Sequence, residues 1–527
     1  MAQRRHNFIS GAAVLALAVA VTKVLGALYK IPLGNLLDKE GMAHFYAAYN
    51  IYNLLLVLST AGLPLALSRL VSRAAAQGRR NAQRRIFRTA LALLAVIGLV
   101  CSAVMCLFPQ VLSGLLHDSL AAPAIRTLGP AVLFVCLTSA IRGYTQGLGD
   151  MTPTAVSQMT ESAGKLVIGL ALCLMLLHRG ADSSLCAAGA IAGVTAGSLL
   201  SLTVLTVFLL RRRDRAAVDV PPARSAVLRE LLTAGIPITL GAAGMSLITL
   251  LDQALVMSTL QNALGYTEAA ATALYGEYTF GMTLFALPPS FIYPVTVSLV
   301  PDISAALARG DRPAAGRSAA AALKLTTLIA LPTGAGLSVL AGPILRLLYP
   351  AVPDTAAAAA YHLTILGIAC IFVCLMVATN GVLQAYGKEY IPVVTLLCGG
   401  ILKIITNYLM VGDPATNVRG APVSTLYCYG LIVVLNLIAI ARCVPERPSY
   451  LRLFARPVLI TAVMALAARS SYGLLARSLP ERWAVLPAIA VAVVVYGVLV
   501  LALGAVTRQD VLDLPKGEKI ARMLHLH

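Results

Sequence analysis

Charged residues are scarce in this sequence. Asp, Glu, Lys and Arg make up 12% of its 527 residues, whereas a soluble domain carries about a quarter. Aromatic residues contribute 6%, with a single tryptophan. A chain with so few polar groups cannot cover a large water-facing surface, so the composition excludes an ordinary soluble domain.

Motifs for metal or redox chemistry are also missing. The ten cysteines lie almost entirely within apolar runs and form no C-x-x-C pair, and the seven histidines form no H-E-x-x-H motif. Zinc sites and zinc hydrolases use such spacings. We therefore expect no metal and no cofactor.

Long apolar runs dominate what is present. Hydrophobic residues make up 59% of the chain and recur from residue 8 to residue 506 with short polar breaks. Since a transmembrane helix needs roughly 20 apolar residues, the runs predict an all-α membrane protein with about fourteen spanning helices. The expected spans are 8–29, 42–67, 89–108, 123–147, 155–178, 184–210, 231–259, 271–299, 317–342, 356–385, 392–410, 422–442, 454–476 and 485–506.

Basic residues concentrate in two of the polar breaks, at 68–88 and 211–229, and contribute to a net charge of +19. Cytoplasmic loops of membrane proteins are rich in Lys and Arg, so we expect both loops and both termini in the cytoplasm. A second interpretation of the loops is binding of anionic lipid headgroups. Because the charge is confined to short loops between spans, we do not expect nucleic acid as a partner.

An internal repeat relates the two halves of the chain. Residues 142–149 (RGYTQGLG) align with 380–387 (NGVLQAYG) at an offset of 238 residues, and a proline follows each. An even number of spans per repeat implies a pseudo-twofold axis along the membrane normal, which is the plan of an alternating-access transporter. The expected parts are two six-helix lobes at 1–215 and 216–445, two further helices at 446–506 and a cytoplasmic tail at 507–527.

Ionisable residues within the expected spans are few, and such groups usually face a cavity or a partner. Glu161 and Lys165 are four residues apart on one helix face, which predicts a structural ion pair. Arg142 and Glu277 lie near span ends, where side chains either snorkel to water or contact a substrate. An unpaired cation such as Lys23 in the first span suits a phosphate, and the alternative is a lysine that snorkels to the headgroups.

A second polar group is expected in the C-terminal lobe. Lys403 and Asn407 share one helix face, Asp252 is the only acid of its span, and Thr425 lies early in another span. Carboxylate, amide and hydroxyl oxygens suit a small cation or a proton. The alternative is an Asp252–Lys403 ion pair that joins the helices, and both interpretations stay open.

Three stretches together resemble a known family. They are residues 22–32 (TKVLGALYKIP), 49–55 (YNIYNLL) and 142–147 (RGYTQG). In this order they resemble the branch of the MOP flippase superfamily that contains MurJ and stage V sporulation protein B. The resemblance implies a MurJ-like fold of two lobes, and movement of an undecaprenyl-pyrophosphate-linked cell-wall precursor, such as lipid II, from the inner to the outer leaflet.

The resemblance also implies residues for substrate binding. Lys23 matches a cavity position where the MurJ pattern has arginine, so its implied role is to attract the pyrophosphate. Two other arginines of that pattern fall on Tyr29 and Leu56 here. We expect substrate contacts from Lys23, Tyr29, Arg142 and Glu277.

Some MurJ-like proteins hold sodium with residues of helices 7, 11 and 12. The matching positions are Asp252, Asn407 and Thr425, whereas Lys403 departs from the pattern. Coupling to sodium or to protons therefore stays open.

We predict a lipid II-like flippase of the cytoplasmic membrane, with a lipid-linked oligosaccharide, membrane lipids and cell-wall synthesis proteins as partners. One alternative is a flippase for another lipid-linked polysaccharide. Another is a multidrug or cation antiporter of the MATE type, whose cavity should be acidic and aromatic. A membrane enzyme would need catalytic carboxylates near an interface, and the short external loops offer few, so we do not expect an enzyme.

Overall fold

The computed structural model describes residues 18, 21, 22, 24–211, 219–444 and 449–505. This described part consists of helices joined by short turns and contains no strand. The expected all-α membrane fold is thus confirmed. Lys23 lies outside the described residues.

The chain divides into two compact units, and each is described by itself. The first comprises residues 1–279 and 407–418, and the second comprises residues 280–406 and 419–527. The lobe boundaries expected from the repeat differ from this division and stay a prediction.

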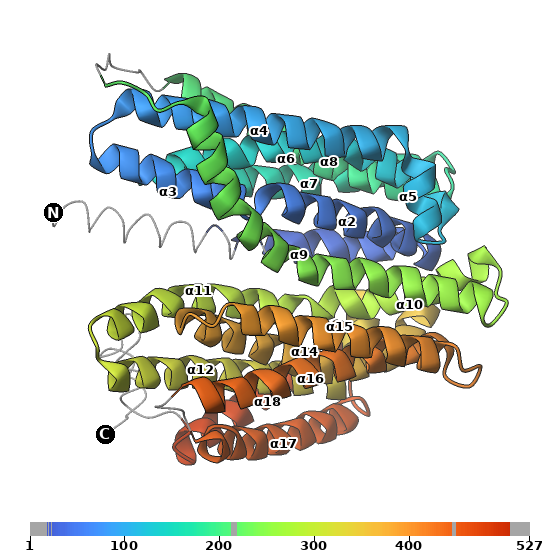
Figure 1. Cartoon of the computed structure of the whole chain (residues 1–527). Helices are drawn as coiled ribbons and strands as arrows, with labels where there is room; N and C mark the ends of the chain where they lie inside the picture. Colours follow the sequence, from blue (N-terminus) through green and yellow to red (C-terminus); the bar gives the residue numbers. More distant parts are fainter. Residues whose placement is uncertain (1–17, 19–20, 23, 212–218, 445–448, 506–527) are drawn as a thin grey trace. The chain divides into compact units, whose positions relative to one another are not determined.

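In the first unit, α6 contacts α2, α3, α4, α7 and α8, and the long helix α9 runs obliquely along α2, α3 and α4 (Figure 1). Residues 24–36 are also helical. The helices are α2 (Lys39–Thr60), α3 (Leu63–Ala76), α4 (Arg80–Leu107), α5 (Pro109–Leu115), η1 (Ser119–Ala121), α6 (Ala122–Gly147), α7 (Thr152–His178), α8 (Ser183–Arg211), α9 (Arg224–Asn262) and the first part of α10 (Glu268–Phe285).

In the second unit, α14 packs against α11, α12, α13 and α16, and the last two helices pack against each other and against α12. The helices are α11 (Leu287–Ala308), α12 (Arg312–Val339), α13 (Ala341–Leu348), α14 (Pro353–Ala385), α15 (Tyr390–Val411), α16 (Gly420–Cys443), α17 (Tyr450–Leu475) and α18 (Glu481–Ala502). The end of α15, from Asn407, and most of η2 (Asn417–Arg419) belong to the first unit.

Twelve helices of the described part are long and apolar enough to cross a membrane. They correspond to the expected spans except the first and the eighth. The first span lies largely outside the described residues, and the eighth is divided between α10 and α11. Pro288 and Pro289 open α11, and since proline has no backbone N–H to donate, it cannot continue α10.

The second expected span is likewise divided, between α2 and α3 at Gly62. A Cβ on Gly62 would overlap the carbonyl oxygen of Gly235 on α9, so the two backbones meet where only glycine fits. The backbone N–H of Gly62 donates a 3.1 Å hydrogen bond to the hydroxyl of Thr239. The break in the helix is therefore fixed by contact with α9.

Glycines also bring α7 and α8 into close contact. A Cβ on Gly193 would overlap backbone atoms of Gly169, and a Cβ on Gly197 would approach the carbonyl oxygen of Glu161. Small residues allow membrane helices to approach closely enough for extensive van der Waals contact. We refer to this contact, with Gly164 included, as the α7–α8 glycine seam.

The segment before α9 caps the start of α4. The carboxylate of Asp219 accepts hydrogen bonds from the backbone N–H groups of Asn81 (2.8 Å) and Ala82 (3.0 Å). Partial loss of water would raise the pKa of Asp219, but these two hydrogen bonds and the nearby Arg79 outweigh that cost and lower it. The first turn of α4 thus obtains a carboxylate partner from a distant part of the chain.

Candidate functional site

Five side chains of the first unit form a lysine–tyrosine cluster: Tyr29, Lys30, Tyr46, Tyr49 and Lys165. Lys30 Nζ donates to the hydroxyl of Tyr46 at 3.2 Å and lies 4.6 Å and 5.3 Å from the ring centroids of Tyr46 and Tyr49. Lys165 Nζ donates to the hydroxyl of Tyr49 at 3.3 Å. It lies 4.8 Å from the centroid of Tyr49 and 5.0 Å from that of Tyr29. Tyr49 therefore lies between two ammonium groups.

The cluster carries positive charge that its own residues do not neutralise. Among the described residues, no carboxylate forms a salt bridge with Lys30 or Lys165. Each cation–π contact contributes about 0.5–2 kcal/mol but leaves the net charge unchanged. Both lysines are only partly buried. The cluster is thus suited to bind an anion.

Tyr29, an expected substrate residue, supports this cluster from within the protein. Its side chain is fully buried, and its hydroxyl donates a 2.8 Å hydrogen bond to the carbonyl oxygen of Ala190. Its ring also lies against Gly169. The structure therefore places Tyr29 in the packing between helices, whereas its neighbour Lys30, which was not among the expected site residues, is partly exposed.

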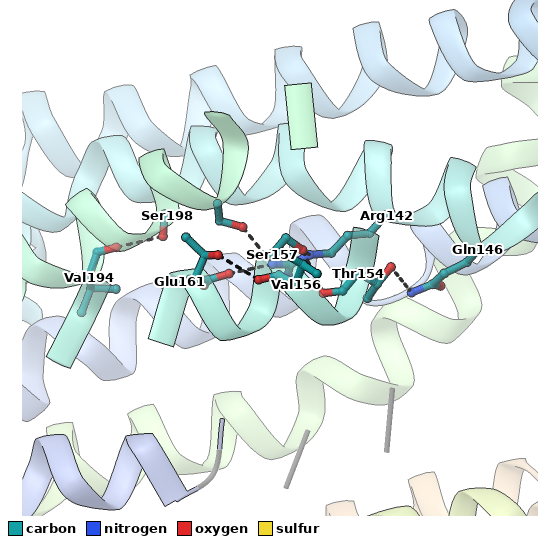
Figure 2. A network of polar contacts seen from close by, with 10 residues as sticks. Arg142, Gln146, Thr154, Val156, Ser157, Glu161, Val194 and Ser198 are labelled. Atoms are coloured by element: carbon teal, nitrogen blue, oxygen red, sulfur yellow. Dashed lines mark hydrogen bonds and ion pairs between the residues drawn. The ribbon is translucent and has the colours of Figure 1, made fainter. Parts of the chain in front are cut away.

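Arg142 joins three helices of the first unit. Figure 2 shows its guanidinium beside Ser157 and Glu161 on α7. Its Nε donates to Ser157 Oγ at 2.9 Å, and one terminal nitrogen donates to Glu161 Oε2 at 2.9 Å and to Ser201 Oγ on α8 at 3.0 Å. The expected substrate-binding arginine thus has its donors directed to protein groups.

The expected Glu161–Lys165 ion pair is wrong in its cationic partner. Glu161 pairs with Arg142 on the neighbouring helix, and Lys165 contacts Tyr29 and Tyr49 instead. A guanidinium can bind a carboxylate and two hydroxyls at once because its donors form a fixed planar fork. An ammonium at Lys165 offers no such geometry.

The second unit contains a counterpart of the Arg142 network. Asn436 on α16 donates to Asn380 Oδ1 at 2.8 Å and to Thr379 Oγ1 at 3.0 Å, and its own oxygen accepts from Thr395 on α15 at 2.8 Å. Asn380 and Thr395 stand 238 residues after Arg142 and Ser157. The repeat therefore extends to hydrogen bonding, with a charged network in one unit and a neutral one in the other.

Glu277, another expected substrate residue, pairs with a lysine. Its Oε1 lies 3.0 Å from Lys39 Nζ at the start of α2. The same region is tightly packed, because a Cβ on Gly276 would overlap the carbonyl oxygen of Lys39. Glu277 thus joins α10 to α2.

The residues expected to hold a cation lie in both units. In the first unit, Asn407 donates a 3.0 Å hydrogen bond to Asp252, and both side chains are buried. Lys403 and Thr425 belong to the second unit and are also buried, with the Thr425 hydroxyl donating to the carbonyl of Ala421 at 3.0 Å. Asp252 and Asn407 are thus brought together, while the roles of Lys403 and Thr425 stay predictions.

Curated relatives span nearly the whole chain. An uncharacterized membrane protein of Bacillus subtilis (strain 168), YabM, is 26% identical over 99% of this chain and 97% of its own length. Stage V sporulation protein B of the same organism is 24% identical over 84% of this chain and 85% of its own length. Lipid II flippase MurJ, also from this organism, is 24% identical over 88% of both chains.

Solved structures establish the fold. A structure described as lipid II flippase MurJ in an inward closed conformation has a TM-score of 0.72 and 14% identity, with 93% of this chain and 98% of that chain covered. An inward-facing MATE family multidrug transporter of the MOP superfamily has a TM-score of 0.65 and 15% identity, with 84% and 98% covered. The fold is therefore that of MurJ and the MATE transporters.

Two family models match the sequence. The MatE model matches residues 237–409. The model described as polysaccharide biosynthesis protein matches residues 8–307, more than half of the chain. With this match added to the helical membrane fold, the chain belongs to the polysaccharide biosynthesis protein family.

Proposed function

We propose that this protein flips a lipid-linked, pyrophosphate-bearing cell-wall precursor of the lipid II type from the inner to the outer leaflet of the cytoplasmic membrane. The observation that carries the proposal is the lysine–tyrosine cluster, where two partly buried ammonium groups have no carboxylate partner among the described residues. A diphosphate is an anion that can satisfy both at once. The names of the relatives MurJ and stage V sporulation protein B agree with such a cargo.

The transport step needs no covalent chemistry. Lys30 and Lys165 attract the diphosphate, and Lys23, which lies outside the described residues, adds a third cation in the same sequence region. The hydroxyls of Tyr46 and Tyr49 hold the ammonium groups in place. Alternating access then exposes the headgroup on the other side while the polyprenyl tail stays in lipid. Asp252 and Asn407 are the residues through which a sodium ion or a proton would couple to this cycle.

A binding measurement tests the proposal directly. Purified protein in lipid nanodiscs should bind a soluble polyprenyl-diphosphate analogue, and Lys30→Ala with Lys165→Ala should weaken binding by about 100-fold, because each lysine supplies a charge-assisted contact of at least 1.4 kcal/mol. Lys30→Arg with Lys165→Arg should retain most of the affinity. Lys388→Ala, a partly buried lysine between α14 and α15, is the matched control.

A cellular experiment identifies the cargo. The gene should support growth of bacteria depleted of their own lipid II flippase and restore the access of external probes to lipid II. The Lys30/Lys165 double alanine variant, expressed at the normal level, should neither support growth nor restore the access of external probes to lipid II. Normal rescue by that variant would contradict the proposed site, whereas failure of the unmodified protein would point to another lipid-linked polysaccharide.

A second function has one specific observation in its favour. The MatE family model matches residues 237–409, and MATE transporters share the fold. A multidrug antiporter should lower the sensitivity of an efflux-deficient host to cationic dyes. The cationic character of the lysine–tyrosine cluster opposes binding of such cargo. Measurable dye resistance without lipid II transport would favour this alternative.

A further inference from the structure

Arginines are concentrated at the start of α4. Its first nine residues, 80–88 (RNAQRRIFR), contain four of them, and neither α4 nor the preceding helix α3 contains an Asp or Glu. Asp219, an acid near this turn, accepts hydrogen bonds from backbone N–H groups instead. Arg80, Arg85 and Arg88 therefore have no carboxylate partner in the part of the chain that the structure describes.

Two of these arginines share a helix face with the apolar part of α4. Arg85, Arg88, Ala92, Val96 and Leu99 follow one another at intervals of three and four residues, so they lie on one side of the helix. Val96 and Leu99 are 60% and 59% exposed, Arg88 and Ala92 are exposed, and Arg85 is half-buried. One continuous face thus begins with two guanidinium groups and continues with apolar side chains.

The opposite face of α4 packs into the first unit. The ring centroid of Phe87 lies 4.5 Å from that of Tyr144 on α6, and a Cβ on Gly98 would come within 2.8 Å of the Cβ of Cys136, also on α6. Figure 1 shows α4 at the margin of the first unit, beside α6. These contacts fix the rotation of α4, so the face with the two arginines points away from the interior of the unit.

The length of α4 places these arginines at a membrane surface. Twenty-eight residues at 1.5 Å each give a helix of about 42 Å, which exceeds the roughly 30 Å of the hydrocarbon core. The uncharged residues 90–107 account for about 27 Å of this length. The basic end must therefore emerge among the headgroups, while the same helix face continues among the acyl chains.

We propose that Arg85 and Arg88 form a binding site for the phosphate of an anionic phospholipid. A guanidinium forms charge-assisted, forked hydrogen bonds with phosphate oxygens. One acyl chain of the same lipid packs along Ala92, Val96 and Leu99. With the orientation expected from the basic loops, the site faces the inner leaflet. It is separate from the lysine–tyrosine cluster and does not depend on the cargo.

The second unit shows that a spanning helix can start without this arrangement. α12 begins two residues after Gly310, as α4 begins two residues after Gly78. Its first nine residues, 312–320 (RPAAGRSAA), contain two arginines instead of four, and Ala320 stands where α4 has Arg88. Positive charge that only fixes orientation needs no particular helix face. The additional arginines of α4 lie instead where a helix face meets lipid.

Native mass spectrometry of the full-length protein tests this site. The protein is freed of bound lipid and mixed in detergent with phosphatidylglycerol or with phosphatidylcholine. We expect preferential retention of phosphatidylglycerol, whose net negative charge is not cancelled by a choline. Arg85→Gln with Arg88→Gln should weaken phosphatidylglycerol binding by about tenfold or more and leave phosphatidylcholine binding unchanged.

Two further variants separate the site from general charge. Arg312→Gln with Arg317→Gln removes the same charge from exposed positions at the start of α12, and it should change phosphatidylglycerol binding by less than about twofold. Arg85→Lys with Arg88→Lys keeps the charge and should retain the preference for phosphatidylglycerol. If the double glutamine variant does not fold, Arg88→Gln alone, at an exposed position, should weaken binding by about threefold.

The proposal is overturned if phosphatidylglycerol binds no better than phosphatidylcholine, or if the glutamine variants on α4 bind it as the unmodified protein does. Equal losses in the α4 and α12 variants would reduce the effect to overall charge and would also overturn it. Dimers in place of lipid adducts, lost in the α4 variant, would assign this face to a second copy of the chain instead. The measurement uses no polyprenyl lipid, so its failure would leave the flippase proposal standing.

Discussion

Asn407 donates a hydrogen bond of 3.0 Å to Asp252, although 155 residues separate the two in the chain. The carbonyl oxygen of Asn407 is buried and accepts no hydrogen bond among the described residues. The buried carboxylate of Asp252 and the amide oxygen of Asn407 thus belong to side chains that are in direct contact. Oxygen atoms of this kind are what a hard cation requires.

We expect sodium to stabilise the protein through Asp252. Replacing choline chloride by sodium chloride at constant ionic strength should raise the Tm of the purified protein by about 2 °C or more, as ligand binding to the folded state does. Asp252→Asn keeps the side-chain shape but removes the charge, and it should abolish the shift. Asp354→Asn, at an exposed acid, is the control. An equal sodium shift in Asp252→Asn would contradict this role.

Breaking the Arg142–Glu161 pair should destabilise the protein because it leaves a carboxylate without its cation. We expect Arg142→Met to lower the free energy of unfolding by about 1–3 kcal/mol, less than the loss of a fully buried pair, because both side chains are only partly buried. Adding Glu161→Gln should recover part of this loss, since the isolated charge is then gone. Denaturation of all variants in detergent gives the double-mutant cycle. Lys165→Met, which does not touch Glu161, should show no coupling to Glu161→Gln.

A methyl group in the α7–α8 glycine seam should be poorly tolerated. Gly193→Ala would force the two backbones apart and should cost about 1–3 kcal/mol, as overpacking does. The matched control is Gly430→Ala in α16, where the added Cβ meets no atom within 4 Å. That control should be neutral or stabilising because alanine favours helix. Comparable losses in the two variants would refute the packing argument.

Removing the Asp219 carboxylate should loosen the first turn of α4. Asp219→Ala should speed hydrogen exchange at the amides of Asn81 and Ala82, which donate to it. The pKa of Asp219 is lowered in the folded protein. The carboxylate therefore protects these two amides from hydrogen exchange fully above the usual aspartate pKa of about 3.9. This protection is lost as the pH falls through the lowered pKa of Asp219. Unchanged exchange at neutral pH would contradict this capping role.

Helix positions were largely predictable because each span is a separate apolar run. The expected span 155–178 lies within α7, and 392–410 lies within α15. Partners across helices were not predictable in this way. The four-residue rule pairs Glu161 with Lys165 because it considers a single helix, whereas Arg142 reaches Glu161 from α6. The signal that was available is that a guanidinium satisfies several acceptors at once.

The candidate site was found only in part. Lys30 was not among the expected site residues because the first expected span ends at residue 29, yet the helix continues to residue 36. The spacing of Tyr46 and Tyr49 on one helix face could have indicated a partner for a cation. Lys165 and Tyr49 meet only through tertiary packing, since 116 positions separate them.

The α7–α8 glycine seam also has a practical consequence. Two helices whose backbones interlock cannot slide or rotate against each other without steric overlap, so they should travel as one body through any conformational cycle. Spin labels at the exposed positions Val167 and Leu200 would then report a constant separation. Such a pair provides an internal standard, against which any change measured elsewhere in the protein can be recognised as genuine motion.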